Sequence, residues 1–314
     1  MVSYSEVSTF RNCALKWHLG YQVGLRPPER IARLDLGSAW DLVLNELFGD
    51  QIGAGEDEIE KRALRGEVKA RWAIANIEDL LPGAVYEKEP EPILHWMLDG
   101  YLEMWRERDY EFEVLAVQQK ISIPTGLRTG NETVRFHGYV DAVLRNRKTG
   151  KIRLRDAKSA SGRDLSSQSW ARELQLDDQF GLYPYVMRRM GYDVDTIEYD
   201  GARVDKLKRE MTPVERFNRV GLYRSPGELD VLWVEFLNGV REMLATERGT
   251  RPITSNPNPM ECRWKCSFMD SHLMGRMNGG DYENAARGYG FTDRKKRASI
   301  LEAEASALGV KELF

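Results

Sequence analysis

The spacing of the hydrophobic residues changes at about residue 113, and this change limits the possible folds of this 314-residue chain more than any other feature. Before residue 113 the apolar side chains recur every three or four residues, as in amphipathic helices. After it they alternate with polar side chains, as in strands. The predicted helices cover residues 36–48, 56–75 and 93–108. The predicted strands cover residues 113–123, 134–144 and 152–160, with a hairpin turn between the last two.

Helical spacing returns further along the chain. Residues 176–190 predict a helix, residues 194–204 a fourth strand, and residues 226–246 a long helix. A short N-terminal helix is expected to begin after a capping serine, Ser3 or Ser5. Helices followed by three strands, a helix, a strand and a helix predict an α/β fold. We expect a central mixed sheet of four or five strands flanked by helices.

Composition is that of a globular protein. Hydrophobic residues make up 42% of the chain and charged residues 30%, which is ordinary for a protein that buries a core. No stretch approaches the roughly 18 apolar residues of a membrane span, and the N-terminus lacks a secretion signal, so a cytoplasmic protein is expected. We expect one domain over residues 1–275. Residues 276–314 are expected to be a charged tail that could contact a protein partner.

The net charge of −3 provides no general attraction to phosphate, so nucleic-acid binding would need a local basic patch. Between residues 145 and 163 there are eight basic residues and a single acid, Asp156. The basic residues are Arg145, Arg147, Lys148, Lys151, Arg153, Arg155, Lys158 and Arg163. We predict that Arg147, Lys148 and Lys151, at the hairpin turn, contact DNA phosphates. A solvated turn without such a role is the alternative.

Two acids and a lysine lie in the predicted hairpin. Asp141 is in one strand, and Asp156 and Lys158 are in the next. Because side chains alternate along a strand, Asp156 and Lys158 point to the same face, where a carboxylate and an ammonium group can meet one phosphate. Phosphodiester hydrolysis needs an activated water and a place for negative charge, and Mg²⁺ or Mn²⁺ held by carboxylates supplies both. These three residues are therefore candidates for a metal-dependent catalytic centre.

These residues belong to an ordered set of motifs. The set consists of Gly138-Tyr139-Val140-Asp141, Asp156-Ala157-Lys158 and Gln179-Phe180-Gly181-Leu182-Tyr183. It is preceded by Ser3-Tyr4-Ser5, Cys13-Ala14-Leu15-Lys16-Trp17 and Gly37-Ser38-Ala39-Trp40-Asp41. Over residues 3–275 this order resembles the RecB/AddB-type exonucleases of the PD-(D/E)xK superfamily. The resemblance implies an Mg²⁺- or Mn²⁺-dependent nuclease that acts on DNA ends or single strands in recombination or repair.

Gln179 and Tyr183 are four residues apart on a predicted helix, so both can face one region. The resemblance implies that Gln179 positions Lys158 or the scissile phosphate, and that Tyr183 contacts DNA or supports the site. Tyr183 also lies on the apolar stripe of this helix, which explains it equally well as a core residue. The active site is expected at the edge where the hairpin and this helix meet.

The chain departs from the family pattern at two positions. Asp41 stands where the family usually has a metal-binding histidine, although a carboxylate can also ligate Mg²⁺. Gln118 stands where many relatives have an acidic residue in the preceding strand. These departures keep an alternative open, a catalytically impaired DNA-binding or assembly subunit that retains the nuclease fold. Site-specific restriction is disfavoured because no recognition domain is visible.

Three cysteines are too few for a disulfide scaffold, and Cys13 is far in sequence from the close pair Cys262 and Cys266. Their positions resemble those of the iron-sulfur subgroup of these nucleases, in which one early cysteine joins three late ones. His272 stands six residues after Cys266, where the fourth ligand is expected. A [4Fe-4S] cluster, a zinc ion, and three buried cysteines without metal all remain open.

Overall fold

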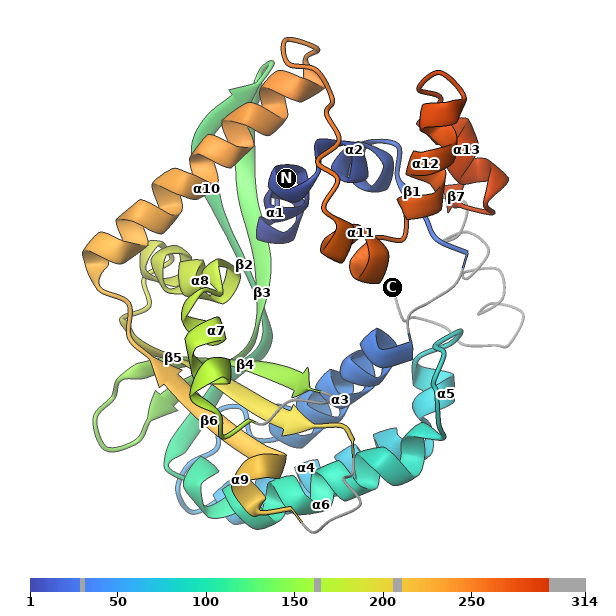
Figure 1. Ribbon diagram of the computed structural model, residues 1–314. Coiled ribbons are helices and arrows are strands. Elements are labelled where there is room, and N and C mark those ends of the chain that lie inside the picture. The colour runs from blue at the N-terminus through green and yellow to red at the C-terminus, as the bar shows by residue number, and fades with distance from the viewer. Residues whose placement is uncertain (29–31, 161–164, 206–210, 294–314) are drawn as a thin grey trace. The chain divides into compact units, whose positions relative to one another are not determined.

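Five strands form one mixed sheet among the residues that the computed structural model describes, 1–28, 32–160, 165–205 and 211–293 (Figure 1). They are, in order across the sheet, β2 (Phe112–Thr129), β3 (Glu132–Asn146), β4 (Ile152–Ala160), β5 (Val194–Arg203) and β6 (Phe217–Leu222). β4 and β5 are parallel, and the other neighbouring pairs are antiparallel. The expected α/β fold with a mixed sheet is confirmed.

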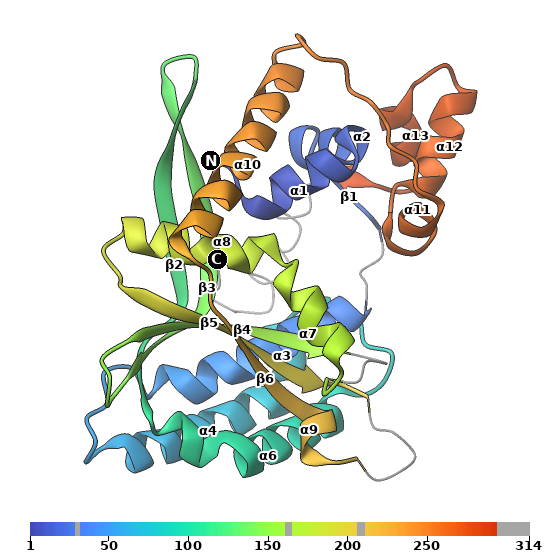
Figure 2. The same ribbon diagram turned by 60° about the vertical axis from the view of Figure 1, so that its left-hand side comes forward.

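β2 and β3 are longer than the other strands of this sheet. They pair with each other along almost their whole length, whereas β3 pairs with β4 only over residues 142–145. The part of β3 before Ala142 therefore leaves the sheet together with β2 as a two-stranded ribbon, which Figures 1 and 2 show extending away from β4. The predicted first strand ended at Ile123, before Pro124. β2 continues past this proline because it is an edge strand, where a missing N–H donor is tolerated.

The chain forms two compact units, and the sheet belongs to the first. This core unit comprises Met1 and residues 31–235. Its helices in the described part of the chain are α3 (Ala32–Gly49), α4 (Ile59–Ala75), α5 (Ile77–Leu80), α6 (Pro90–Asp109), α7 (Gln168–Gln175), α8 (Asp178–Arg189), α9 (Pro213–Arg216) and the first part of α10 (Pro226–Glu247). α3, α4 and α6 share a hydrophobic core with the sheet. This core contains Trp40, Met97, Leu144 and Phe217.

The helices predicted at residues 36–48, 56–75 and 93–108 correspond to α3, α4 and α6. α6 begins earlier than predicted, at Pro90, because proline fits the first turn of a helix, where its missing N–H would be unpaired in any case. The sequence did not predict α7 and β6. They have eight and six residues, too few for a hydrophobic period to stand out.

The second unit, which we call the terminal unit, combines the two ends of the chain, described over residues 2–28 and 236–293. Its elements include α1 (Tyr4–Asn12), α2 (Ala14–Trp17), a π-helical turn (His18–Gln22), β1 (Leu25–Arg26), α11 (Pro259–Lys265), α12 (Met269–Met277), α13 (Tyr282–Gly288) and β7 (Thr292–Asp293). β1 and β7 pair antiparallel. Early and late residues share one core, formed by Leu15, Leu19, Leu25, Phe268, Ala286 and Phe291.

Two expectations for the termini can be compared with this unit. Ser3 caps α1, because its Oγ accepts a hydrogen bond from the backbone N–H of Glu6 at 3.2 Å. The segment expected as a charged tail contains α13 and β7, while its residues 294–314 lie outside the described part of the chain. None of the helices within the described residues has the length and apolar composition needed to cross a bilayer.

Candidate active site

Asp141 lies where β3 separates from β4. The hydrogen-bonded ladder between these strands ends at Ala142, which pairs with Arg155. One residue further, the Asp141 Oδ2 atom accepts a hydrogen bond from the backbone N–H of Ala157 at 2.9 Å. A backbone donor that has lost its strand partner needs another acceptor, and the Asp141 side chain provides it. The predicted strand carboxylate is thus fixed directly beside the Asp156-Ala157-Lys158 motif.

Lys158 forms an ion pair with Asp156, as expected for residues two apart on one strand. The Lys158 Nζ atom is 2.7 Å from Asp156 Oδ2 and 3.7 Å from Asp177 Oδ2. Burial alone would lower the pKa of Lys158, but the Asp156 and Asp177 carboxylates raise it above its ordinary value. Lys158 is therefore a permanently charged ammonium group.

Asp41 adds a third carboxylate, from α3. Burial, followed by the negative charges of Asp141 and Asp156, raises the pKa of Asp41 to about 7. Burial also raises the pKa of Asp141, and burial together with Asp141 raises the pKa of Asp156 to about 7 despite the opposing effect of Lys158. The charge of Lys158 therefore does not offset the burial and mutual repulsion of the three carboxylates, and a bound cation would.

The donor chemistry of these carboxylates fits a hard divalent cation, because Mg²⁺ and Mn²⁺ prefer oxygen ligands. Among the described residues, no three His, Cys, Asp or Glu side chains are close enough together to hold a metal ion as they stand. Asp41, Asp141 and Asp156 would have to converge by changes of side-chain rotamer.

Two glycines of the sequence motifs are explained by close approach. A Cβ atom on Gly37 would lie 2.9 Å from the Oγ of Ser159, the residue after Lys158. The absence of a side chain at Gly37 therefore lets α3 approach β4 next to the ion pair. A Cβ on Gly138 would lie 3.1 Å from the Tyr183 hydroxyl oxygen, so Gly138 gives α8 access to β3. Both glycines bring a helix to the diverging strands.

Gln118 lies beside Asp141 in a strained backbone conformation. Its φ angle is 46°, in the left-handed region that a side chain rarely adopts, and such strain costs about 1–3 kcal/mol. Its Nε2 atom is 3.5 Å from Asp141 Oδ1 and 3.4 Å from the Oδ1 atom of Asn45. Gln118, which stands where the resemblance to the exonucleases implies an acidic residue, thus contacts the Asp141 carboxylate. Asn45 was not predicted, although it lies four residues after Asp41 on α3.

Gln179 and Tyr183 meet on α8. The Gln179 Nε2 atom donates a hydrogen bond to the Tyr183 hydroxyl at 3.1 Å. The Tyr183 ring is buried against Phe136 and Phe180, at centroid distances of 6.4 and 5.7 Å. Burial raises the pKa of Tyr183, and the charges of Asp156 and Asp141 raise it further. Tyr183 is therefore a core residue whose ring lies within the electrostatic range of both carboxylates.

Asp177 is a site residue that the sequence analysis missed. It is the N-cap of α8, because its Oδ1 accepts a hydrogen bond from the backbone N–H of Phe180 at 3.2 Å. Its other carboxylate oxygen lies 3.7 Å from Lys158 Nζ. An aspartate directly before a helical pattern is a known helix-start signal, and it could have drawn attention to this position. Asp177 connects the lysine to the helix that carries Gln179 and Tyr183.

The run of eight basic residues does not form one surface. Arg155 is buried and donates hydrogen bonds to Glu198 and Asp109, both at 2.9 Å. Arg153 donates to the same glutamate at 2.7 Å. Side chains on alternate positions of β4 face opposite sides, so these arginines face an internal ion network while Asp156 and Lys158 face the site. The expectation of one continuous basic patch was therefore wrong.

The turn itself is partly occupied by structural contacts. Arg147 donates hydrogen bonds to the backbone oxygens of Tyr110 and Ala54, at 3.2 and 2.9 Å. Lys151 Nζ is 3.4 Å from the carboxylate of Asp193, and Lys148 is exposed. The last member of the run, Arg163, lies outside the described residues. DNA contact by this turn stays a prediction.

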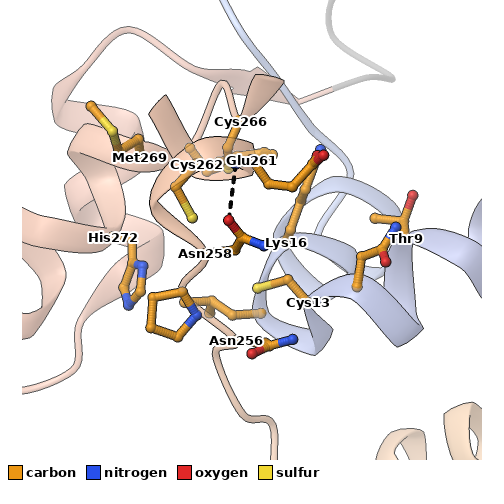
Figure 3. A pocket seen from close by; sticks show the side chains of 14 residues that line it. Thr9, Cys13, Lys16, Asn256, Asn258, Glu261, Cys262, Cys266, Met269 and His272 are labelled. Carbon is orange, nitrogen blue, oxygen red and sulfur yellow. Dashed lines mark hydrogen bonds between the residues drawn. The ribbon is translucent and has the colours of Figure 1, made fainter. Parts of the chain in front are cut away.

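The three cysteines and His272 line one cavity of about 140 Å³ in the terminal unit (Figure 3). All three thiols are free of disulfide bonds, and burial raises the pKa of the Cys266 thiol. Burial lowers the pKa of His272, and its Nε2 atom is buried without a hydrogen-bond partner among the described residues. Cys13 is thus beside the late pair, as a common ligand set requires.

Two strand carboxylates beside a half-buried lysine, with a third carboxylate on a helix, are the groups that metal-assisted phosphodiester cleavage uses. The sequence model of the PD-(D/E)XK nuclease superfamily matches residues 1–271. The chain therefore belongs to the PD-(D/E)XK nuclease superfamily, whose members generally use divalent metal ions. The mixed sheet flanked by helices is the fold of this family.

The chain is also similar to a solved structure, the crystal structure of a candidate exonuclease from Eubacterium rectale. The two sequences are 11% identical, the similarity covers 84% of this chain and 92% of the other, and the TM-score is 0.48. A search of curated protein sequences found no relative. The assignment to the nuclease family rests on the family match and on the site geometry.

Proposed function

We propose that this protein is an Mg²⁺- or Mn²⁺-dependent deoxyribonuclease, and specifically an exonuclease, with Asp141, Asp156 and Lys158 as its catalytic centre. The observation that carries the proposal is the contact of Asp141 with Ala157. It places one carboxylate beside a second carboxylate and a charged lysine. The exonuclease assignment follows the order of the sequence motifs, and a role in recombination or repair of DNA goes with it.

Asp41, Asp141 and Asp156 would hold the metal ion in this proposal. The raised pKa values of these carboxylates support it, because a cation relieves the repulsion between them. When bound, the ion would lower the pKa of a water molecule and neutralise charge on the phosphate. Gln118 and the Ala157 N–H each donate a hydrogen bond to the Asp141 carboxylate and so orient it.

Lys158 would stabilise the negative charge that develops on the phosphate. Asp156 and Asp177 hold its ammonium group from two sides, which fixes its direction. Gln179 and Tyr183 would support the site from α8. The hydrogen bond between them connects the Gln179 amide to the buried Tyr183 ring.

We also propose that the cavity in the terminal unit holds a metal centre, with Cys13, Cys262, Cys266 and His272 as ligands. The unpartnered Nε2 atom of His272 supports this, because a buried polar atom without a partner is costly. Among the described residues these side chains are not close enough together for one ion. The ligands of a [4Fe-4S] cluster bind different irons and stand further apart, so we favour the cluster over zinc.

The alternative function is an impaired subunit that binds DNA without cleaving it. Two observations favour the impaired subunit. Asp41 stands where the family usually has a histidine, and Gln118 stands where many relatives have an acidic residue. The decisive experiment incubates labelled single-stranded and duplex DNA with the protein and Mn²⁺, with Asp141→Ala and Asp156→Ala as controls. We expect cleavage by the parent and a loss of at least about 100-fold in each variant. A parent that binds DNA but does not cleave it would favour the impaired subunit.

A further inference from the structure

One face of the ribbon formed by β2 and β3 leads directly to Asp141. Opposed residues of an antiparallel pair share a face, and successive residues alternate between the two faces. On this ribbon Lys120 is opposite Tyr139, Ser122 is opposite His137, and Pro124 is opposite Arg135. The six side chains therefore line one face. The same alternation along β3, in steps of two residues, continues to Asp141.

The opposite face of the ribbon is already used. Its residues Ile121, Ile123 and Phe136 are buried, and the Phe136 ring packs edge-on against Tyr183 and Trp233. In contrast, Lys120, Arg135 and Tyr139 are all exposed. The face with Phe136 therefore packs on α8 and α10 of the core unit, and the face with Lys120, Arg135 and Tyr139 is open to solvent.

The open face, which we call the ribbon track, carries positive charge without counter-charge. From residue 119 to residue 140 the only acidic residue is Glu132, near the tip of the ribbon. In the described part of the chain, neither Lys120 nor Arg135 forms an ion pair. Ser122 holds Arg135 by accepting hydrogen bonds from its guanidinium at 3.1 Å on Oγ and 3.2 Å on the backbone oxygen. Arg135 is therefore oriented before any ligand arrives.

Tyr139 is the aromatic residue of the ribbon track. Its side chain is 52% exposed, and it stands two residues before Asp141, about 7 Å along the strand. Within the described residues its hydroxyl has no hydrogen-bond partner and its ring has no aromatic neighbour. An exposed ring on the same face as cations is the arrangement that stacks on unpaired bases while the cations follow the backbone. In a duplex the faces of the bases are hidden, so the arrangement suits a single strand.

We propose that the ribbon track guides a single DNA strand to Asp141, with a base stacked on Tyr139 and phosphates held by Lys120 and Arg135. The inference rests on the proposed nuclease function and deepens it by naming the single strand as the bound form. It also places strand binding on the ribbon, a surface separate from the turn at residues 146–151. Steps of two residues along the strand are comparable to the spacing of phosphates in an extended strand.

The test measures DNA binding by the full-length protein made inactive by Asp156→Asn, in the presence of Mn²⁺. The probes are fluorescein-labelled oligothymidylate and a blunt duplex. We expect Tyr139→Ala to weaken oligothymidylate binding about tenfold and Tyr139→Phe to leave it unchanged, because stacking needs only the ring. Lys120→Gln should reduce the slope of log affinity against log salt by about 0.7. Duplex binding should change less than twofold in each variant.

A matched control is Tyr223→Ala, which removes another exposed tyrosine, next to β6 at the opposite edge of the sheet. It should bind both probes like the parent. Tyr139→Ala should also keep the parental melting temperature, since an exposed ring contributes little to the core. A variant with unchanged melting but weaker single-strand binding supports the ribbon track.

Several results would overturn the ribbon track. Parental binding of oligothymidylate by Tyr139→Ala excludes it, even if the parent protein cleaves DNA. An equal loss on duplex excludes the single-strand assignment, and an equal loss in Tyr139→Phe excludes stacking. Stronger binding of the matching RNA excludes DNA as the ligand. A parent that cleaves neither probe contradicts the proposed nuclease function instead, and the binding comparison still decides on the ribbon track.

Discussion

The Asp141 carboxylate accepts a hydrogen bond from the backbone N–H of Ala157 at 2.9 Å, at the point where β3 and β4 separate. Ala157 stands between Asp156 and Lys158, so this one bond sets the position of the first carboxylate relative to the other two groups. The bond replaces the backbone acceptor that β3 no longer supplies. The end of a strand ladder is therefore also what aligns the candidate catalytic residues.

This contact predicts different stabilities for two substitutions at Asp141. Asp141→Asn keeps an acceptor for the Ala157 N–H and removes a charge whose burial is unfavourable, so without metal it should melt at or above the parental temperature. Asp141→Ala leaves the N–H unpaired, which costs about 1–3 kcal/mol when the group is buried. Both should lose cleavage. Thermal melts in EDTA check the difference, and equal melting temperatures would show that the hydrogen bond adds no stability.

Asp156 should make the metal-free protein sensitive to pH. Burial, together with the charge of Asp141, raises its pKa from 3.8 to about 7. The folded state therefore binds more protons than the unfolded chain within this window, and stability falls as the pH rises through it. Asp156→Asn should raise the melting temperature in EDTA at pH 8 but not at about pH 4. A gain of the same size at both pH values would argue against this titration.

Lys158 should contribute mainly to the rate of cleavage. Its ammonium group acts on charge that grows during the reaction, so Lys158→Ala should reduce turnover by about 10²- to 10³-fold. DNA affinity should change much less. Single-turnover rates and binding constants, measured side by side, separate the two effects. Losses of equal size in rate and affinity would show that Lys158 only attracts the phosphate and does not act specifically on the transition state.

The turn between β3 and β4 offers a test of the predicted basic contacts. Arg147 is engaged by two backbone oxygens, so neutralising Arg147 should destabilise the fold as well as affect binding. Lys148→Gln and Lys151→Gln avoid this problem. On single-stranded DNA the double variant should lower the slope of log affinity against log salt by up to about 1.4. A parental slope would show that the turn is only solvated.

The terminal unit should lose stability when one ligand of its metal centre is removed. The centre would close a loop from Cys13 to Cys262, so Cys262→Ala should lose iron or zinc, melt earlier and lose activity indirectly. His272→Cys should keep a cluster, because thiolate is its usual ligand. Visible absorbance and elemental analysis of freshly purified protein identify the metal. Metal-free, colourless parent protein with full stability would leave three buried cysteines without a ligand role.

Local pattern was enough to predict several parts of the site. The switch from helical to alternating spacing located α3, α6, β3 and β4 to within a few residues. Strand alternation put Asp156 and Lys158 on one face, where they form an ion pair at 2.7 Å. Such features depend on neighbours in sequence, because a repeating hydrophobic spacing reports directly which side of an element is buried.

Only the tertiary structure decided which residues meet across the chain. Asp41 and Asp141 are separated by 100 positions, and their proximity follows from the packing of α3 against the strands. Likewise, the Arg155 side chain is buried and unavailable to DNA, because on its face of β4 it is paired with Asp109 and Glu198. A single residue's type states what it can bind, while strand order and packing determine what it reaches. The sequence therefore determined the kind of chemistry, and the fold determined its partners.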